Sequence, residues 1–302
     1  MGTLLVCDPI ADSAVEAIRA AGIPVDVRND IEPDALAEII GSYEGMVVRS
    51  RTKVRAPLID RADQLKVIIR AGVGLDNIDV NYAQDKGIDV RNTPQASTNA
   101  VVELALALMF ALARPVVRAD TEMKSGTWAK KQLTGTELAG KTLGIVGYGR
   151  IGRALGEKAK SLGMTVMASD PYVEHEDIVP METLLAAADY VSIHVPHTEE
   201  THNLVGADEF ASMKNGAYLI QASRGGTVDE DALLAVLENG KLAGAALDVY
   251  TEEPPVKDEL RALAEHPHVV ATPHIGAGTV EAKARIGDEV IKLAKAYLAP
   301  SA

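Results

Sequence analysis

The sequence holds a single cysteine among its 302 residues, so no disulfide bond can form within the chain. A chain without disulfides is typical of a reducing compartment, and we expect a cytoplasmic protein. The lone Cys7 ends the apolar run Leu4–Cys7, and an inert core thiol is the favoured interpretation. Aromatic residues make up only 4% of the chain, so aliphatic side chains must fill its cores. The first residues lack the basic segment, apolar stretch and cleavage site of a secretory signal, and we expect none.

Positive charge is also in short supply. Thirty Lys and Arg residues stand against 43 Asp and Glu residues, which gives a formal net charge of −13. A chain this acidic is a poor ligand for nucleic acid or anionic membranes, and the longest apolar run, near residues 104–113, is too short to span a bilayer. We therefore expect no nucleic acid or membrane partner, although a few arginines can still bind a small anion. No metal site is expected either.

Short apolar runs alternate with helix-like stretches through the first part of the chain. The runs of strand length lie at Leu4–Cys7, Val25–Val27, Met46–Val48, Val67–Ile69 and Ile88–Val90. The helix-like stretches lie at Asp12–Ala21, Pro33–Ile40, Ala56–Arg61 and Val80–Lys86. Strands that alternate with helices predict parallel βαβ units, and strands that are almost entirely apolar predict a sheet covered on both faces.

Asn92-Thr93-Pro94 interrupts this alternation. A long apolar helix then extends over residues 97–113, and its composition predicts burial nearly all round, between domains or between subunits. A connecting arm follows over residues 124–138. A second alternating series has strands at Leu143–Val146, Thr165–Ala168, Tyr190–Ile193, Ala217–Ile220, Gly244–Leu247 and Val269–Ala271, and a last helix near Val280–Leu298. We therefore expect two doubly wound parallel-sheet α/β domains, one of residues 1–95 completed by 281–302 and one of residues 96–280.

The segment from Lys141 to Gly152 combines a strand, a GxGxxG turn and the start of a helix. Gly147 permits the tight turn, Gly149 lets the backbone approach a pyrophosphate, and Gly152 lets helix and strand pack closely. The predicted cofactor site here comprises Gly147, Gly149, Arg150, Ile151, Gly152 and Asp170, the acid after the next strand, with further acids at Glu174 and Glu176. A carboxylate there holds ribose hydroxyls and repels a 2′-phosphate, so a Rossmann domain that binds NAD rather than NADP is predicted. A glycine cluster that only serves the turn is the alternative.

Three loops after predicted strands carry polar side chains of catalytic type: Ala222–Gly226, Asp248–Pro255 and Pro273–Gly278. The carboxyl ends of parallel strands face the ligand crevice, so these loops are candidates for one site. Oxidation of a 2-hydroxy acid needs a base for the hydroxyl proton, and a histidine oriented by a carboxylate meets that need near neutral pH. An arginine holds the substrate carboxylate with two hydrogen bonds. Taken singly, each residue is also compatible with a structural or solvated role, and only their combination favours chemistry.

These segments resemble the D-2-hydroxyacid dehydrogenase family over nearly the whole chain. The similar stretches are Val48–Val54, Arg70–Asp79, Asn92–Pro94, Gly126–Trp128, the glycine turn, Ser223–Gly226, Leu247–Pro255 and Pro273–His274. The resemblance implies that Arg224 binds substrate and that His274 is the acid/base. It also implies that Glu253 pairs with the histidine, since Glu253 rather than Glu252 directly precedes the proline pair. The nicotinamide and ribose pocket is implied to include Val73, Val195, Pro196, Ala222, Ser223, Asp248 and Gly276. The family usually has Asn where this chain has Gln221, a difference that we expect to alter packing near the site.

The first domain, expected to be flavodoxin-like, is expected to decide the substrate. Arg49 follows one strand and Arg70 ends the next, and paired guanidinium groups suit a phosphate or a carboxylate. The resemblance implies a substrate site that comprises Arg49, Ser50, Arg70, Gly72, Val73, Gly74 and Asn92. Further basic residues in this stretch are Arg51, Lys53 and Arg55. For Arg51 and Arg55, a solvated or acid-paired role is equally compatible with the sequence.

Within the family the similarity is greatest to enzymes that act on 3-phosphoglycerate. Oxidation of this acid to 3-phosphohydroxypyruvate, a step toward L-serine, is therefore the expected reaction. Reduction of glyoxylate, hydroxypyruvate or another 2-keto acid is the first alternative, and a corepressor-like protein that senses NAD(H) is the second.

Assembly is implied by the long apolar helix and the arm that follows it, which predict a homodimer. By the resemblance, Lys130 or Lys131 of the arm would reach the substrate bound to the partner subunit. Long members of the family carry an additional C-terminal regulatory domain. This sequence ends just after its final helix, so we expect it to correspond to the short form, without feedback control by serine.

Overall fold

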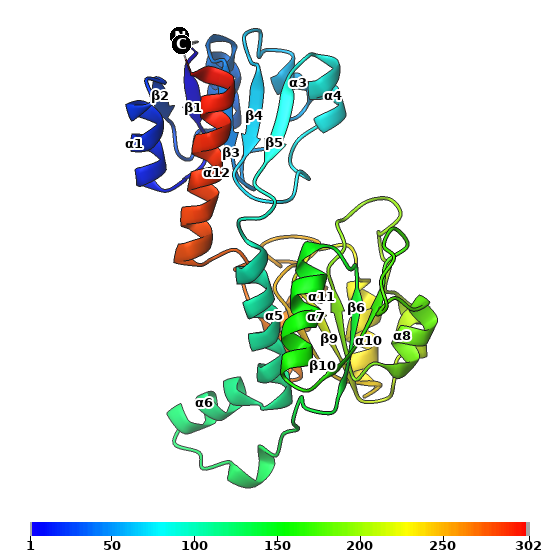
Figure 1. Ribbon diagram of the computed structural model, residues 1–302. Coiled ribbons are helices and arrows are strands. Elements are labelled where there is room, and N and C mark those ends of the chain that lie inside the picture. The colour runs from blue at the N-terminus through cyan, green and yellow to red at the C-terminus, as the bar shows by residue number, and fades with distance from the viewer. Residues whose placement is uncertain (1, 300–302) are drawn as a thin grey trace. The chain divides into compact units, whose positions relative to one another are not determined.

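Strands, most of them made of buried aliphatic residues, alternate with helices along the chain, as the apolar pattern predicts. The computed structural model, which describes residues 2–299, divides into two compact units (Figure 1). Unit 1 comprises the residues up to Ser97 together with those from Ala277 onward, and unit 2 comprises Thr98–Gly276. Each unit is built around its own parallel sheet.

The sheet of unit 1 has five parallel strands in the order β2-β1-β3-β4-β5. They are β1 (Leu4–Val6), β2 (Val25–Val27), β3 (Gly45–Val48), β4 (Val67–Arg70) and β5 (Asp89–Asn92). Its helices are α1 (Asp12–Ala20), α2 (Pro33–Ile39), α3 (Ala56–Ile59), α4 (Val80–Asp85) and α12 (Val280–Leu298), with a 3-10 turn η1 at Ile40–Ser42. This strand order is that of the flavodoxin-like doubly wound fold.

Alternate residues of the unit 1 strands enter two separate cores, because successive side chains of a strand point to opposite faces. Leu5 and Ile68 pack in one core, and Leu4 and Ile69 pack in the other. The second core is completed by α12, whose Val290 is fully buried there. Figure 1 shows α12 in red beside α1 and the blue strands, so the last helix of the chain returns to the first sheet. Full burial of one such side chain contributes about 1.5–3 kcal/mol.

The sheet of unit 2 has six parallel strands in the order β11-β10-β9-β8-β6-β7. They are β6 (Thr142–Val146), β7 (Thr165–Ser169), β8 (Tyr190–Ile193), β9 (Ala217–Gln221), β10 (Leu242–Leu247) and β11 (Val269–Ala271). Its helices are α5 (Thr98–Ala113), α6 (Val116–Lys124), α7 (Arg150–Ser161), α8 (Met181–Ala187), α9 (Ala207–Ser212), α10 (Glu230–Glu238) and α11 (Asp258–Glu265), with a 3-10 turn η2 at Lys130–Gln132. Buried aliphatic residues again form a core on each face of the sheet.

Both sheets have a point at which the strand order reverses. In unit 1 this switch point lies between β1 and β3, and in unit 2 it lies between β6 and β8. Ligands of open α/β sheets bind outside the carboxyl ends of the strands at such points. The loops at the carboxyl ends of these four strands, and of their parallel neighbours at the same edge of each sheet, are therefore candidates for binding residues.

Within one chain, α5 is buried mainly along one face, and Phe110 is 44% exposed. Cover of its other sides by the other domain or by a second subunit stays a prediction. Helix α6, which was not predicted, has no buried residue, and Trp128 in the arm beyond it is 75% exposed. Among residues 2–299, no single helix has the length and apolar content to cross a membrane. Within the same residues, the pair α5 and α6 meets the requirements of length and apolar content when the two helices are taken together, and the pair is bent by 65°.

Candidate active site

The glycine turn after β6 has the geometry that a dinucleotide pyrophosphate needs. Gly147 has a φ of 92°, a conformation that side chains other than hydrogen disfavour. A Cβ at Gly152 would lie 2.2 Å from the carbonyl oxygen of Gly147, so α7 packs tightly against the turn. A Cβ at Gly149 would meet nothing within 4 Å. The space over Gly149 and the N-terminal amides of α7, which begins at Arg150, thus suits an anionic group.

A carboxylate is fixed beside this turn. Asp170 directly follows β7, and its two oxygens accept hydrogen bonds from the backbone amides of Tyr148 (2.8 Å) and Tyr172 (2.9 Å). Each carboxylate oxygen has a second lone pair, so Asp170 can still accept from ribose hydroxyls. The exposed Glu174 and Glu176 follow in the same loop and add negative charge.

The end of β8 contacts the glycine turn at His194, which sequence analysis did not single out. The His194 amide donates to the carbonyl of Val146 (2.7 Å), and Nε2 of His194 lies 2.8 Å from Oγ of Ser192. Its Nδ1 is shielded from solvent and has no hydrogen-bond partner within residues 2–299. Burial lowers the pKa of His194 to about 4. Val195 and Pro196, predicted to line the nicotinamide pocket, follow directly in the chain.

Hydrogen bonds of the Gln221 side chain hold the turn that carries Arg224. The buried Gln221 amide donates to the Arg224 carbonyl (3.0 Å) and to Oγ1 of Thr227 (2.6 Å), and its oxygen accepts from the Ser223 hydroxyl (2.8 Å). Gln221, which the sequence analysis expected to alter packing near the site, therefore shapes the Arg224 turn. Gly225 brings that turn against the next loop, because a Cβ there would lie 1.9 Å from the Tyr250 carbonyl oxygen.

His274 and Glu253 form a close pair. Nδ1 of His274 lies 2.7 Å from Oε2 of Glu253, whose Oε1 accepts from the Tyr250 amide (3.3 Å). Burial alone would raise the pKa of Glu253, but the hydrogen bond and charge of His274, the Tyr250 amide and the charge of Arg224 together lower it below its ordinary value. Glu252, the alternative weighed in the sequence, pairs with Lys257 at 2.7 Å instead.

Asp248, predicted to line the cofactor pocket, is almost fully buried and holds the His274 loop. Its Oδ1 accepts from the Thr272 hydroxyl (2.6 Å) and the Ile275 amide (2.8 Å), and its Oδ2 accepts from the Gly276 amide (2.8 Å). His274 has a φ of 51°, in the left-handed region. Because a non-glycine residue with this φ is strained, the three hydrogen bonds to Asp248 help to hold it there.

In unit 1, the predicted substrate residues gather at the ends of β3, β4 and β5. Nη2 of Arg70 donates to the hydroxyl of Ser50 (3.1 Å), and the Arg70 guanidinium lies directly over Gly72, where it occupies the position of a Cβ. Nδ2 of Asn92 donates to the carbonyl of Val73. Within residues 2–299, the guanidinium of Arg49 has no hydrogen bond or ion pair, so it is free to bind an anion.

The other basic residues of this stretch have partners within the chain. Arg51 pairs with Asp8 (3.1 Å) and Asp30 (3.5 Å), and Arg55 pairs with Asp79 (2.8 Å). The ammonium of Lys53 donates to the carbonyl of Ser50 (3.3 Å). For Arg51 and Arg55, the structure thus favours the acid-paired alternative that the sequence left open.

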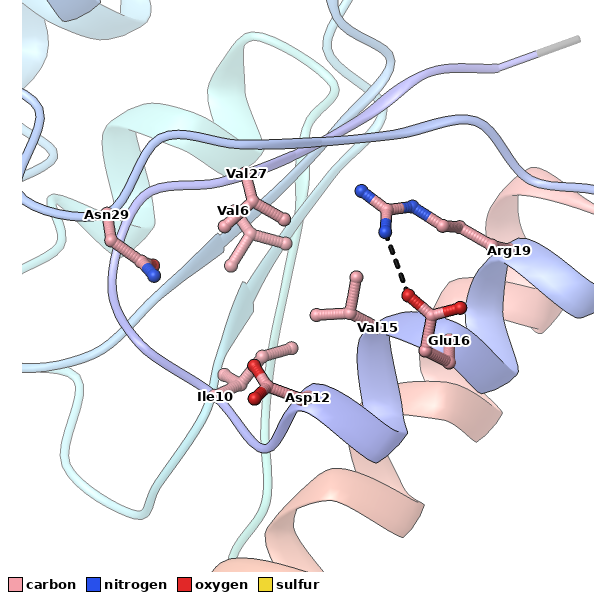
Figure 2. A pocket seen from close by; sticks show the side chains of 8 residues that line it. All are labelled: Val6, Ile10, Asp12, Val15, Glu16, Arg19, Val27 and Asn29. Carbon is pink, nitrogen blue, oxygen red and sulfur yellow. Dashed lines mark hydrogen bonds and ion pairs between the residues drawn. The ribbon is translucent and has the colours of Figure 1, made fainter.

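Unit 1 also has a pocket of about 240 Å³ between α1 and the strands β1 and β2. Figure 2 shows the residues that line it: Val6, Ile10, Asp12, Val15, Glu16, Arg19, Val27 and Asn29. Arg19 is paired at 2.9 Å with Glu16, three positions earlier on α1. None of the predicted site residues lines this pocket.

A sequence profile described as D-isomer specific 2-hydroxyacid dehydrogenase, NAD binding domain, matches residues 106–276. The chain belongs to this family, and unit 2 contains its NAD-binding domain. The predictions of the family and of NAD as cofactor are therefore confirmed. The glycine turn and Asp170 are the residues of this chain that fit the cofactor.

Individual relatives carry different names. The chain is 43% identical over 303 residues to a D-3-phosphoglycerate dehydrogenase of Archaeoglobus fulgidus, a match that spans 97% of this chain and 57% of that protein. It is also 43% identical over 291 residues to a hydroxypyruvate reductase of Thermotoga maritima, with 95% of each chain covered. The crystal structure of a glyoxylate reductase from Paecilomyes thermophila has a TM-score of 0.90 at 29% identity, over 98% of this chain and 95% of that one. The predicted fold class is thereby confirmed.

Proposed function

We propose that this chain transfers a hydride between NAD and C2 of a small 2-hydroxy acid, with His274 as the acid/base. The observation that carries the proposal is the 2.7 Å contact between Nδ1 of His274 and Oε2 of Glu253. The loop of Glu253 packs against the turn that carries Arg224, and the chain belongs to a family of 2-hydroxyacid dehydrogenases. A histidine held through Nδ1 by a carboxylate presents Nε2 to a substrate in a defined orientation.

The proton chemistry follows from that arrangement. Nε2 of His274 takes the hydroxyl proton of the 2-hydroxy acid, while Glu253 stabilises the imidazolium that forms. NAD, when bound, accepts the hydride that leaves C2. Arg224 binds the carboxylate of the acid through paired hydrogen bonds and orients the reacting carbon. In the reverse direction His274 returns the proton to the oxygen of the 2-keto acid.

We propose 3-phosphoglycerate as the acid, with 3-phosphohydroxypyruvate as the product on the way to L-serine. The unpaired guanidinium of Arg49, together with Ser50 and Arg70, supports recognition of a phosphate at the far end of the substrate. The D-3-phosphoglycerate dehydrogenase of Archaeoglobus fulgidus, at 43% identity, supports the same substrate.

Reduction of hydroxypyruvate or glyoxylate is the second candidate. The match to the Thermotoga maritima hydroxypyruvate reductase, at the same 43% identity, covers 95% of both chains and favours it. Hydroxypyruvate is smaller than 3-phosphohydroxypyruvate by the phosphoryl group alone, so the two candidates differ in what Arg49 and Arg70 contribute.

The deciding measurement is NADH oxidation by the purified protein with 3-phosphohydroxypyruvate, hydroxypyruvate and glyoxylate in parallel. An advantage in kcat/KM of roughly a hundredfold, about 2.7 kcal/mol, for the phosphorylated acid supports the first candidate. A flat or reversed preference assigns the chain to unphosphorylated acids. Binding of NADH without turnover of any acid would favour the corepressor-like alternative.

We also propose a homodimer formed through α6 and the arm. Val116, Val117, Met123 and Trp128 are each more than half exposed, an apolar surface that suits burial against a second copy. Lys130 and Lys131 are exposed in the same arm and are candidates to reach the partner's substrate. A Val117→Lys, Trp128→Ala double variant is expected to lower the mass measured by light scattering.

The cytoplasmic location and the lack of nucleic-acid and membrane partners stay predictions of the sequence.

A further inference from the structure

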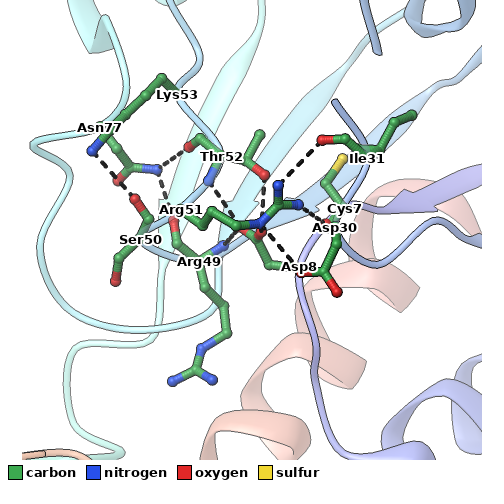
Figure 3. Close-up of polar contacts among 10 residues, drawn as sticks. All are labelled: Cys7, Asp8, Asp30, Ile31, Arg49, Ser50, Arg51, Thr52, Lys53 and Asn77. Atoms are coloured by element: carbon green, nitrogen blue, oxygen red, sulfur yellow. Dashed lines mark hydrogen bonds and ion pairs between the residues drawn. The ribbon is translucent and has the colours of Figure 1, made fainter. Parts of the chain in front are cut away.

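Asp8 is a buried carboxylate at the switch point of unit 1. It lies just beyond β1, beside the end of β3, and only 1% of its surface is exposed. Dashed lines in Figure 3 converge on it from the residues that follow β3. Four donors reach its two oxygens: Arg49 N at 2.6 Å, Thr52 N at 3.3 Å, Thr52 Oγ1 at 2.9 Å and Arg51 Nε at 3.1 Å.

The same turn, residues 49–52, is also held from its other side. The buried Asn77 amide donates to the carbonyls of Arg49 and Thr52, both at 2.7 Å. Arg51 extends the network by donating to the carbonyls of Cys7 (3.0 Å) and Ile31 (3.2 Å). The backbone amides of Arg49 and Thr52 are therefore bound by Asp8, and their carbonyls are bound by Asn77.

The side chain of Arg49 takes no part in this network. Figure 3 shows its guanidinium pointing away from Asp8, while its backbone is held from both sides. The negative charge of Asp8 is met by Arg51 and by backbone amides, so it does not need the Arg49 guanidinium as a partner. The positive charge of Arg49 therefore stays available at the carboxyl ends of the strands, where ligands of this fold bind.

We propose that Asp8 is a positioning residue that fixes residues 49–52 so that Arg49 and Ser50 present a preformed site for the anionic end of the substrate. The inference rests on the proposed function, in which Arg49, Ser50 and Arg70 bind that end. A carboxylate suits this position, because Asp8 accepts hydrogen bonds from three N–H groups and from the Thr52 hydroxyl. An amide in its place would direct its own N–H groups either at Nε–H of Arg51 or at the backbone amides of Arg49 and Thr52, and a buried donor would be left without an acceptor.

The test compares Asp8→Asn and the milder Thr52→Val, which removes one donor, with Asp79→Asn. Asp79 is a matched control because it also accepts a backbone amide, that of Ala56 (2.9 Å), and pairs with an arginine, Arg55, without contacting residues 49–52. Steady-state kinetics with 3-phosphohydroxypyruvate and hydroxypyruvate are measured for each variant. NADH binding by fluorescence and hydrogen exchange of the peptide that spans residues 45–54 are measured alongside.

Asp8→Asn is expected to raise KM for the phosphorylated acid by roughly tenfold or more, since a misplaced binding group has effects of this order. KM for hydroxypyruvate and NADH binding are expected to change much less. Amide exchange over residues 49–52 is expected to accelerate, and Thr52→Val is expected to shift the same quantities in the same direction by a smaller factor. Asp79→Asn is expected to change none of them.

Unchanged exchange over residues 49–52 in Asp8→Asn would overturn the proposal whatever acid the protein uses. An equal rise in KM for 3-phosphohydroxypyruvate and for hydroxypyruvate would also overturn it, because that result would indicate general destabilisation of the protein. Failure of the proposed substrate is recognised separately, since the wild-type protein would then show no preference for the phosphorylated acid while the exchange result still decides the role of Asp8.

Discussion

His274 and Glu253 lie 21 positions apart in the chain, and their Nδ1 and Oε2 atoms are 2.7 Å apart. The two residues belong to loops that follow neighbouring parallel strands, β10 and β11. Asp248 ties these loops together, since it precedes Glu253 in one loop and accepts hydrogen bonds from the other. The pairing is therefore a property of two loops fixed to each other as well as of two complementary side chains.

Replacement of the pair tests the proposed chemistry most directly. His274→Ala is expected to lower kcat by about 10²–10⁴-fold, the usual contribution of a general acid/base, with NADH binding unchanged. Glu253→Gln is expected to lower kcat less, because the imidazole remains but loses its charged partner. Glu252→Gln is the matched control, since Glu252 pairs with Lys257. Wild-type kcat in His274→Ala would remove this histidine from the mechanism.

Asp248 is expected to act through the His274 loop. Asp248→Asn retains the size of the side chain but cannot accept from all three donors, so His274 loses its fixed backbone. A decrease in kcat on the order of tenfold to a hundredfold is expected, with a smaller decrease in Thr272→Val, which removes one donor. If Asp248→Asn instead weakened NADH binding alone, the pocket-lining role implied by the family resemblance would be the better account.

Coenzyme choice is expected to depend on Asp170. Asp170→Ser removes the carboxylate that opposes a 2′-phosphate, so the ratio of kcat/KM with NADPH to that with NADH is expected to rise by about tenfold, or about 1.4 kcal/mol. Parallel assays of both coenzymes give the ratio. Glu174→Gln, further along the same loop, is expected to change it less. An unaltered ratio in Asp170→Ser would place the discrimination elsewhere.

Recognition of the phosphate is expected to depend on Arg49 and Arg70 together. The Arg49→Ala, Arg70→Ala variant is expected to lose about a hundredfold or more in kcat/KM for 3-phosphohydroxypyruvate, at about 1.4 kcal/mol for each factor of ten. The loss with glyoxylate, which has no phosphate, is expected to be much smaller. Arg55→Ala controls for loss of a basic residue already paired to an acid. Equal losses with both acids would argue against phosphate recognition.

Stability is expected to fall in mild acid because of His194. Its pKa is lowered from 6.5 to about 4 by burial, so between those values the unfolded chain binds a proton that the folded chain does not. The free energy of unfolding therefore has its full value, as far as His194 is concerned, above about pH 6.5. It decreases by up to about 3 kcal/mol as the pH falls toward 4. Urea unfolding between about pH 7 and pH 5 measures this loss. His194→Gln is expected to flatten the pH dependence, and an identical slope in the variant would contradict the assignment to His194.

Much of the fold could be predicted from local patterns in the sequence. The apolar runs located all eleven strands of the described residues within a few positions. Most of these strands are buried, and a strand buried on both faces is almost entirely apolar. The glycine turn was recognisable for a similar local reason, since a positive φ at Gly147 and close packing at Gly152 each demand glycine. An apolar composition does not say which sides of a helix are covered or by what, so the burial of α5 between domains or subunits stays a prediction.

What only the tertiary structure decided is which polar residues have partners and which are left for a ligand. Arg49, Arg51 and Arg55 lie close together in the sequence, and only the family resemblance set Arg49 apart. Within residues 2–299, Arg51 and Arg55 are paired with acids, whereas the Arg49 side chain is not. Asp8 and Asp248 each follow a buried strand, but their backbone donors lie 41 and 27 positions away. A sequence pattern records the local preferences of neighbouring residues, whereas hydrogen bonds between strand ends depend on the order of strands in the sheet. The sequence thus determined the elements, the family and the chemical groups of the candidate site, and the folded sheets determined which of those groups are fixed and which are free.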